Sequence, residues 1–272
     1  MSFVDKFVAE VLSIEVALYH AHARMQARTD SEALHDLRIA VRRIRSLLRP
    51  LRSLDEITAL NEAAADVGRL TTPCRDLEVL IEELDVHGLQ KQAEDRRRIL
   101  FTSYTDIHNS PVIKKLFTCL DDWPSAFRSA ERSGELVHIE KQITKALSKQ
   151  VDCLHAGLLD PQYDRHQLRI LVKRTRYLTS AFPNLSPLSS KGAASLKAVQ
   201  SALGSWHDHF QWCLKAKVEK DLQPLEMLWQ EAATAALAHA ATQLLELAGL
   251  LPTASAKKEP PKTATNKRVT DS

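Results

Sequence analysis

Two stretches of the chain repeat one pattern of apolar positions. In each stretch, apolar residues recur at alternating spacings of three and four, which places them on one side of an α-helix. We therefore expect two helices that bury these positions against the rest of the protein. The first set is Leu34, Leu37, Val41, Ile44, Leu48 and Leu51, and the second is Leu168, Leu171, Thr175, Leu178 and Phe182.

A basic stripe lies directly beside each apolar stripe. Residues three and four apart are neighbours on a helix surface, so each set forms a continuous line of positive charge. At 1.5 Å per residue, the first line extends over roughly 25 Å. The first stripe is His35, Arg38, Arg42, Arg45, Arg49 and Arg52, and the second is His166, Arg169, Lys173 and Arg176.

The two stretches are copies of one sequence. "HDLRIAVRRIRSL" at 35–47 aligns without gaps with "HQLRILVKRTRYL" at 166–178, and eight of the thirteen positions are identical. Each copy follows a long amphipathic stretch, at about 3–28 and about 135–158. Each is followed by a basic residue and an aspartate, Arg75-Asp76 and His207-Asp208. The chain is therefore predicted to contain two equivalent halves.

The boundary between the halves is predicted at 131–135, where Ser133 and Gly134 would end a helix. We expect one domain over 1–251, made of halves 1–132 and 133–251, with a disordered basic tail at 252–272. Prolines are expected to mark helix ends, which gives about four helices in each half. These prolines are Pro50, Pro73, Pro111, Pro161, Pro183, Pro187 and Pro224.

Composition favours an all-α fold, because the chain has only 6% aromatic residues and 7 glycines. The predicted fold is two pseudo-symmetric antiparallel helical bundles around a basic groove or pore. The net charge is +3, and the tail alone carries five basic and two acidic residues, so the body is electrically balanced. The basic stripes therefore reflect local segregation of charge and not a generally cationic protein.

Cellular location is predicted from the cysteines and from the hydrophobic segments. The four cysteines form no CxxC pair, so neither a zinc site nor a disulfide framework is expected, and a cytoplasmic protein is favoured. Acids at Asp5, Glu10 and Glu15 interrupt the first apolar run, which argues against a signal peptide. The Ala- and Leu-rich segment 231–251 carries a polar stripe, so it is predicted to pack in a bundle and not to span a membrane.

The chemistry of the stripes suits a polyanion. A guanidinium can bind two phosphate oxygens at once, and neither GxxxxGK[ST] nor GxGxxG occurs in the chain. No cofactor is therefore expected, and side chains along rigid helices would hold the ligand. The alternative is internal salt bridges, for which the acids of "EEL" at 82–84 and of "DD" at 121–122 are available.

Both motif copies, with the later "RDLEVL" and "LGSWHD" segments, resemble the CHAD domain, the conserved histidine α-helical domain. The resemblance covers residues 1 to about 225. It implies a basic groove or pore that binds inorganic polyphosphate, and association with polyphosphate granules and their proteins. The positions carried over are His35, Arg38, Arg42, Arg43, Arg45, Arg49, Arg75, His166, Arg169, Lys173, Arg174, Arg176, Lys197 and His207.

Other functions are weighed against polyphosphate binding. An enzyme is not predicted: a metal-dependent phosphohydrolase needs converging carboxylates, and Asp36 should point away from the stripe as a helix cap or surface salt bridge. No metal ligands are therefore assigned. Nucleic acid is the main alternative ligand, but the stripes offer few aromatic rings for stacking and no Asn or Gln for base edges. A general polyanion surface or a scaffold on granules also stays open.

Overall fold

The computed structural model describes residues 2–252, and this part of the chain folds into α-helices and three short 3-10 helices, without β-strands. The all-α prediction is therefore confirmed. The tail predicted at 252–272 lies outside the described residues, except for Pro252. The elements are α1 (Phe3–Ala27), α2 (Ala33–Leu48), η1 (Arg49–Leu51), α3 (Asp55–Val86), α4 (Gln90–Asn109), α5 (Pro111–Ser133), α6 (Ile139–Leu159), α7 (Arg165–Ala181), η2 (Pro183–Leu185), α8 (Ser190–Ala216), η3 (Lys220–Leu225) and α9 (Glu226–Leu250).

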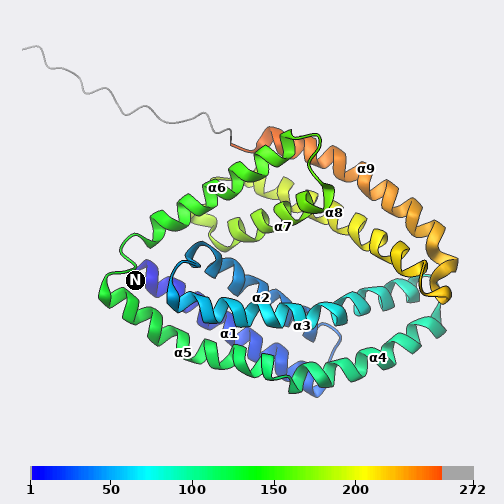
Figure 1. Ribbon diagram of the computed structural model, residues 1–272, viewed down its shortest axis with the longest axis horizontal. Coiled ribbons are helices and arrows are strands. Elements are labelled where there is room, and N and C mark those ends of the chain that lie inside the picture. Colours follow the sequence, from blue (N-terminus) through cyan, green and yellow to red (C-terminus); the bar gives the residue numbers. More distant parts are fainter. Residues whose placement is uncertain (1, 253–272) are drawn as a thin grey trace, which may run out of the picture.

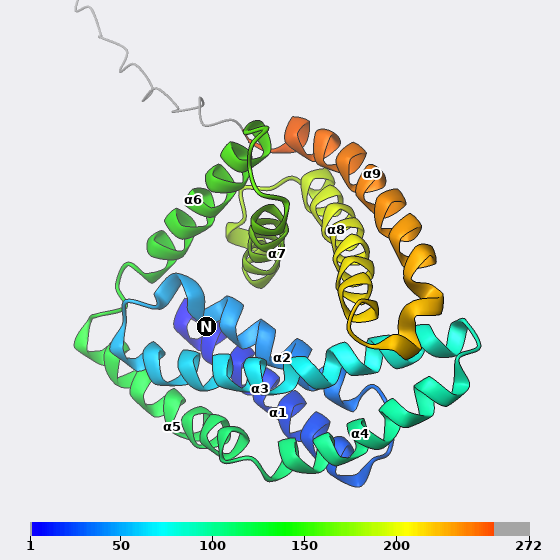
Figure 2. The ribbon, with the colours of Figure 1, turned by 45° about the vertical axis from the view of Figure 1, so that its right-hand side comes forward.

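The helices form two groups that follow one another along the chain (Figure 1). Helices α1 to α5 make one group, and α6 to α9 make the other, where about four per group were expected. Helices α4 and α5 run along one outer edge, while α6 and α9 form the opposite edges (Figure 2). The motif helices α2 and α7 pack against each other, so the two copies meet between the groups. A pseudo-symmetric relation between the groups stays a prediction.

Local sequence signals explain several helix ends. Ser2 accepts a hydrogen bond from the Asp5 N–H and completes a capping box at the start of α1. Pro111 occupies the first turn of α5, where a missing N–H costs nothing. Gly134 follows α5 with φ of 86°, a left-handed conformation that glycine adopts without a steric penalty. The predicted helix break at 131–135 is therefore confirmed.

Pro73 does not end a helix, which corrects the prediction. Helix α3 runs through it from Asp55 to Val86, and α3 packs on α2, α4 and α5. Side-chain donors reinforce the turn before the proline: Thr71 Oγ1 donates to Val67 O and Thr72 Oγ1 to Gly68 O, both at 2.8 Å. Tertiary packing and these bonds outweigh the local tendency of proline to break the helix.

The apolar stripe of α2 lies in the core as expected. Each of its members from Leu34 to Leu51 is at most 3% exposed. The larger of two hydrophobic clusters spans α1 to α5 and also includes residues of α6, such as Ile143, and Trp229 of α9. The smaller cluster contains only residues from α6 onward, among them Val172 and Leu196. The motif helices therefore stand on a packed core that fixes their positions.

Polar contacts join the two helix groups away from the motif helices. Arg96 of α4 binds Glu219 and Asp221 at 2.5 and 2.8 Å, and Trp229 Nε1 of α9 donates to Glu83 Oε1 of α3 at 2.9 Å. These contacts hold the turn between α8 and α9 against α3 and α4. Within residues 2–252, none of the helices combines the length and the apolar character needed to cross a bilayer, α9 included.

Candidate functional site

A basic groove of about 670 Å³ lies between α2, α3 and α7. Nine cationic side chains line it, and no carboxylate does. The remaining lining is apolar or uncharged, and it includes Ser46, Asn61, Thr72 and Tyr177. We call this surface the basic groove. Its cations are Arg38, Arg42, Arg45, Arg49, Arg52, Arg69, Arg169, Lys173 and Arg174.

The position of the groove follows from the two stripes of each motif helix. Leu37, Val41 and Ile44 of α2 are buried, so the basic stripe one residue further on faces the edge of the buried surface. Val172 and Leu178 fix α7 in the same way. Because α2 and α7 pack together, their basic stripes border one concave surface.

Eight of the nine cations have no carboxylate partner in the part of the chain that the structure describes. The exception is Arg69, which pairs with Asp66. Arg38 donates instead to Thr71 Oγ1 at 2.7 Å and to Gly68 O at 3.2 Å. Arg42 donates to Tyr177 Oη at 2.5 Å, a bond that links α2 to α7. The groove therefore keeps positive charge that no salt bridge within the described residues neutralises.

The acids suggested as partners for the stripes lie elsewhere. Glu83 accepts hydrogen bonds from His87 and Trp229, and Glu82 lies 4.0 Å from Arg75. Asp121 of α5 accepts a hydrogen bond from Tyr19 of α1. The alternative in which these acids pair with the arginine stripe is therefore wrong.

Crowding of like charges changes the acid–base properties of Lys173. Burial, together with the charges of Arg169, Arg42 and Arg38, lowers its pKa from 10.5 to about 8. Burial also lowers the pKa of Arg45, together with the charges of neighbouring arginines. These shifts show that the fold holds the charges in a poorly solvated and mutually repulsive arrangement.

A histidine pair lies beside Arg169, outside the groove lining. The ring centroids of His166 and His207 are 5.3 Å apart. Burial, Arg169 and His166 lower the pKa of His207 to about 4, so its imidazole is neutral at pH 7. Burial raises the pKa of Asp76 and of Asp208, although nearby cations oppose the shift. The later motif segments of both halves thus converge at this point.

Half of the predicted site residues line the groove and half do not. Arg43 pairs with Glu10 at 2.5 Å, Arg75 pairs with Glu78 at 2.8 Å, and Arg176 donates to Gln200 Oε1 at 2.6 Å. Lys197 is exposed on α8. The predicted residues in the groove are Arg38, Arg42, Arg45, Arg49, Arg169, Lys173 and Arg174, and those outside its lining are His35, Arg43, Arg75, His166, Arg176, Lys197 and His207.

Sequence reasoning missed the contribution of α3. Asn61, Ala65, Gly68 and Thr72 line the groove at spacings of four, three and four, and Arg69 adds a charge. This run of small or polar side chains on one helix face was the available signal. Arg52 was placed on the first stripe but not among the candidate site residues, and it too lines the groove.

The acidic residue of the first motif, Asp36, forms a salt bridge on the surface. Asp36 accepts a hydrogen bond from Arg24 Nη1 at 2.6 Å, so its predicted role in a surface salt bridge is confirmed. Over residues 2–252, no group of three or more His, Cys, Asp or Glu side chains is arranged to hold a metal ion.

Fold and groove together define the class: an all-helical domain in which side chains on helices, and not a glycine-rich loop, form a basic concave surface. Residues 12–214 match the CHAD domain model, which is more than half of the chain. The protein therefore belongs to the CHAD domain family, a family associated with polyphosphate binding, and the resemblance predicted from the two motif copies is confirmed.

Comparison with solved structures supports the same fold. The crystal structure of the CHAD domain from the plant Ricinus communis matches with a TM-score of 0.64 at 22% sequence identity, and 91% of each chain is covered. At this identity the match establishes the fold alone. No curated protein matches the sequence.

Proposed function

We propose that the protein binds inorganic polyphosphate in the basic groove. One observation carries the proposal: eight groove cations have no carboxylate partner in the described residues, and no carboxylate lines the groove. An extended chain of phosphates supplies the missing counter-charges at regular intervals. Charge-assisted bonds from guanidinium groups to phosphate oxygens are among the stronger hydrogen bonds in proteins.

The rigidity of the groove supports a linear ligand. Most of its cations stand on α2, α3 and α7, and Arg49 stands on η1, so little backbone entropy is lost when a ligand binds. Residues Arg38 to Arg49 span three turns of helix, roughly 16 Å. Several successive phosphates fit along this distance, whereas a single nucleotide would contact only part of it.

Base-free phosphate chains fit the groove better than RNA does. Tyr177 is the only aromatic residue in the groove lining. The guanidinium of Arg42 lies 4.8 Å from its ring centroid and that of Arg176 lies 5.3 Å away. The ring that could stack a nucleotide base is therefore already occupied by arginines.

Competition binding tests this proposal. Labelled long-chain polyphosphate is bound to the protein at physiological salt and challenged with RNA of equal phosphate content. We expect RNA to displace the label poorly, and Arg42→Ala with Lys173→Ala to weaken binding at least about tenfold, because two central cations are lost. Equal displacement by RNA would indicate a general polyanion surface.

A matched variant separates local charge from net charge. Lys145 and Lys149 are exposed on α6, away from the groove, and neither forms a salt bridge within the described residues. Changing both to alanine removes the same two charges. Binding within about twofold of the unchanged protein is expected, since only screened long-range attraction is lost. Equal losses in both double variants would contradict a defined groove.

We also propose that the groove binds polyphosphate without hydrolysing it. Its lining contains neither a carboxylate nor an imidazole that could activate water. Incubation of the protein with a chain of defined length, with and without magnesium, should leave the chain length unchanged on a gel. Shortening of the chain would overturn this part of the proposal.

Association with cytoplasmic polyphosphate granules is the cellular expectation of the proposal. A fluorescent fusion of the full chain should overlap with granules, and the variant with Arg42→Ala and Lys173→Ala should spread through the cell. Granule staining that persists in this variant would point to recruitment by a granule protein.

A further inference from the structure

The basic groove ends near the starts of the two motif helices. Its lining begins at Arg38 on α2 and at Arg169 on α7, although both basic stripes continue one turn earlier to the motif histidines. On α3 the lining ends at Thr72, whose Oγ1 accepts a hydrogen bond from Arg38 at 3.2 Å. The next residue on the same face of α3, one turn further on, is Asp76. The helix face that lines the groove therefore continues into an acid.

The second half of the chain places an equivalent acid at the same end. Asp208 of α8 belongs to the later motif segment of that half, as Asp76 does to that of the first. The start of α7 meets α8 here, because the ring centroids of His166 and His207 are 5.3 Å apart. Burial raises the pKa of Asp208, Arg169 opposes the rise, and the negative charge of Asp76 adds to it. The two acids therefore lie within electrostatic reach of each other and of Arg169.

Neither acid neutralises a groove cation through a direct ion pair. Within the part of the chain that the structure describes, Asp76 and Asp208 form no salt bridge and accept no side-chain hydrogen bond. Burial raises the pKa of Asp76, and the charges of Arg38 and Lys215 oppose the rise without cancelling it. A close ion pair would lower this pKa instead. Both acids thus keep their negative charge available to act on a ligand in the groove.

The cations on the far side of the acids are already paired. Arg75 binds Glu78 at 2.8 Å, and Lys215, two turns after Asp208 on α8, binds Glu219 at 3.3 Å. The opposite end of the groove carries cations that form no salt bridge within residues 2–252, namely Arg49, Arg52 and Arg174. Unpaired positive charge is therefore concentrated on one side of the acids.

We propose that Asp76 and Asp208 end the path of bound polyphosphate. The chain lies from Arg38 and Arg169 towards Arg49 and does not continue past the two acids. This inference rests on the proposed function and specifies where along the groove the ligand stops. Every phosphate unit is negatively charged, so a unit placed beside the acids is repelled and finds the next cations already paired. The groove thus holds a segment of limited length, and longer chains leave it at the Arg49 end.

Protection of lysines from acetylation maps the path in the unchanged protein. The full chain is acetylated near neutral pH with and without long-chain polyphosphate, and mass spectrometry follows each lysine. We expect polyphosphate to slow the acetylation of Lys173, which lines the groove, at least about fivefold, and that of Lys215 less than about twofold. Lys145, exposed on α6, is the unprotected reference.

The outcomes of this mapping separate the inference from the proposed function. Equal protection of Lys173 and Lys215 would overturn the inference, because the chain would then pass the acids. Protection of neither lysine would contradict polyphosphate binding in the groove itself. Both results come from the unchanged protein and do not depend on the folding of a variant.

Removal of the two charges tests the cause. Asp76→Asn with Asp208→Asn keeps the side-chain shapes and should lead polyphosphate to protect Lys215 as well. Long chains should bind this variant at least about threefold more tightly, and tetraphosphate, which fits within the groove, should gain less. Asp152→Asn with Glu231→Gln removes two exposed charges on α6 and α9 and should change affinity less than about twofold. Equal gains in both double variants, equal gains for short and long chains, or an unprotected Lys215 in the first variant would overturn the proposal.

Discussion

Arg96 on α4 and Arg38 on α2 lie in two regions that differ in how an arginine is paired. Arg96 has carboxylate partners, whereas Arg38 has hydroxyl and carbonyl partners. Arg96 is 7% exposed and binds both Glu219 and Asp221. Burial opposes its charge, but the hydrogen bonds to Asp221 and Glu219 outweigh burial, so its pKa lies above the usual value. Arg38 is half-buried without a salt bridge in the described residues, and burial and Arg42 hold its pKa below the usual value.

The difference between the two arginines indicates that the groove charges serve binding and not the stability of the fold. Around Arg96 the positive charge is neutralised inside the fold and joins α4 to η3. In the groove, charges of the same kind are held close together, and apart from Arg69 none of them forms a salt bridge within the described residues, an arrangement that costs stability in the free protein. A polyanion would remove that cost on binding. Substitutions in the two regions should therefore have opposite effects on stability.

Arg96→Ala should produce the largest change. It removes a nearly buried guanidinium that pairs with two partly exposed acids and joins α4 to η3, so we expect a loss of about 2 kcal/mol in the free energy of unfolding. Urea denaturation measures this loss. Arg98→Ala on the same helix, where the arginine is 74% exposed, is the control and should cost less than about 0.5 kcal/mol. Similar losses in both variants would show that the ion pairs of Arg96 stabilise the fold no more than an exposed arginine does.

Lys173→Met should act in the opposite direction. The ligand-free protein should gain about 1–2 kcal/mol, because a poorly solvated charge among arginines is replaced by an apolar chain of similar length. Polyphosphate binding should weaken at the same time. Thermal unfolding with and without polyphosphate measures both effects. A loss of stability in the free variant would show that the ammonium group has a favourable role in the fold.

Polyphosphate affinity should fall as the pH rises through the pKa of Lys173. That pKa is about 8 in the free protein, because of burial and the neighbouring arginines, and a bound polyanion raises it. The ammonium is therefore mostly charged at pH 7 and mostly neutral at pH 9, and affinity should drop by up to about tenfold between them. Lys173→Arg keeps its charge and should flatten the profile. An unchanged profile in that variant would assign the pH dependence to another group.

The same linkage fixes the sign of the stability change in the free protein. The folded pKa of Lys173 lies below its unfolded value of 10.5, so the charged form is disfavoured by folding. Its contribution therefore lowers stability below pH 8, and stability recovers as the pH rises from about 8 to 10.5. Polyphosphate should reduce this recovery, because the ligand compensates the charge.

The helices and the central part of the groove follow from the sequence for a physical reason. A period of three and four residues fixes which side of α2 is buried, and the adjacent stripe must then lie at the edge of that surface. The motif repeat identified Arg42 and Lys173 as equivalent members. The partner of each charged side chain, by contrast, is set by the tertiary structure. Arg43, one residue from Arg42, pairs with Glu10 of α1, and the spacing of residues along the chain does not predict this pair.

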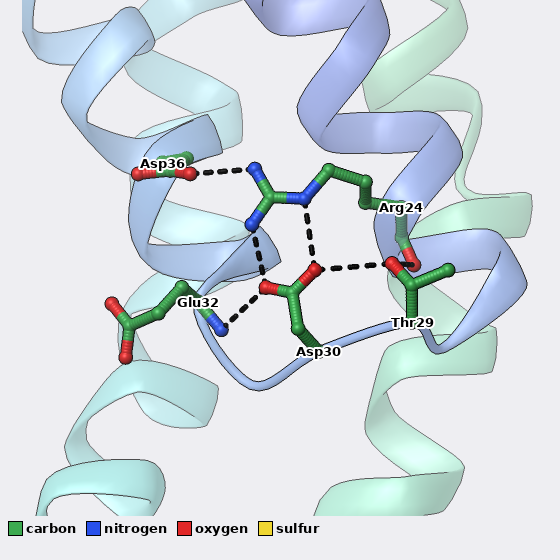
Figure 3. A network of polar contacts seen from close by, with 5 residues as sticks. All are labelled: Arg24, Thr29, Asp30, Glu32 and Asp36. Atoms are coloured by element: carbon green, nitrogen blue, oxygen red, sulfur yellow. Dashed lines mark hydrogen bonds and ion pairs between the residues drawn. The ribbon is translucent and has the colours of Figure 1, made fainter.

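Two further features could not be read from the pattern. Proline statistics predict a helix end at Pro73, but packing on three sides keeps α3 continuous and brings Asn61 and Arg69 to the groove. The cavity between α3, α4 and the loop after α1 likewise depends on the path of that loop, where Asp30 is held by Arg24 (Figure 3). Both features arise from tertiary contacts, which the local pattern of residues does not specify.

His207→Ala should have the smallest effect on polyphosphate binding. Burial, Arg169 and His166 hold the pKa of His207 near 4, so it brings no charge at pH 7, and it lies outside the groove lining. A change of less than about twofold is expected in the competition assay, whereas Arg169→Ala should weaken binding several-fold, since Arg169 lines the groove. A loss in His207→Ala as large as that in Arg169→Ala would mean that the imidazole contacts the ligand directly, and the binding surface would then extend beyond the groove to the histidine pair.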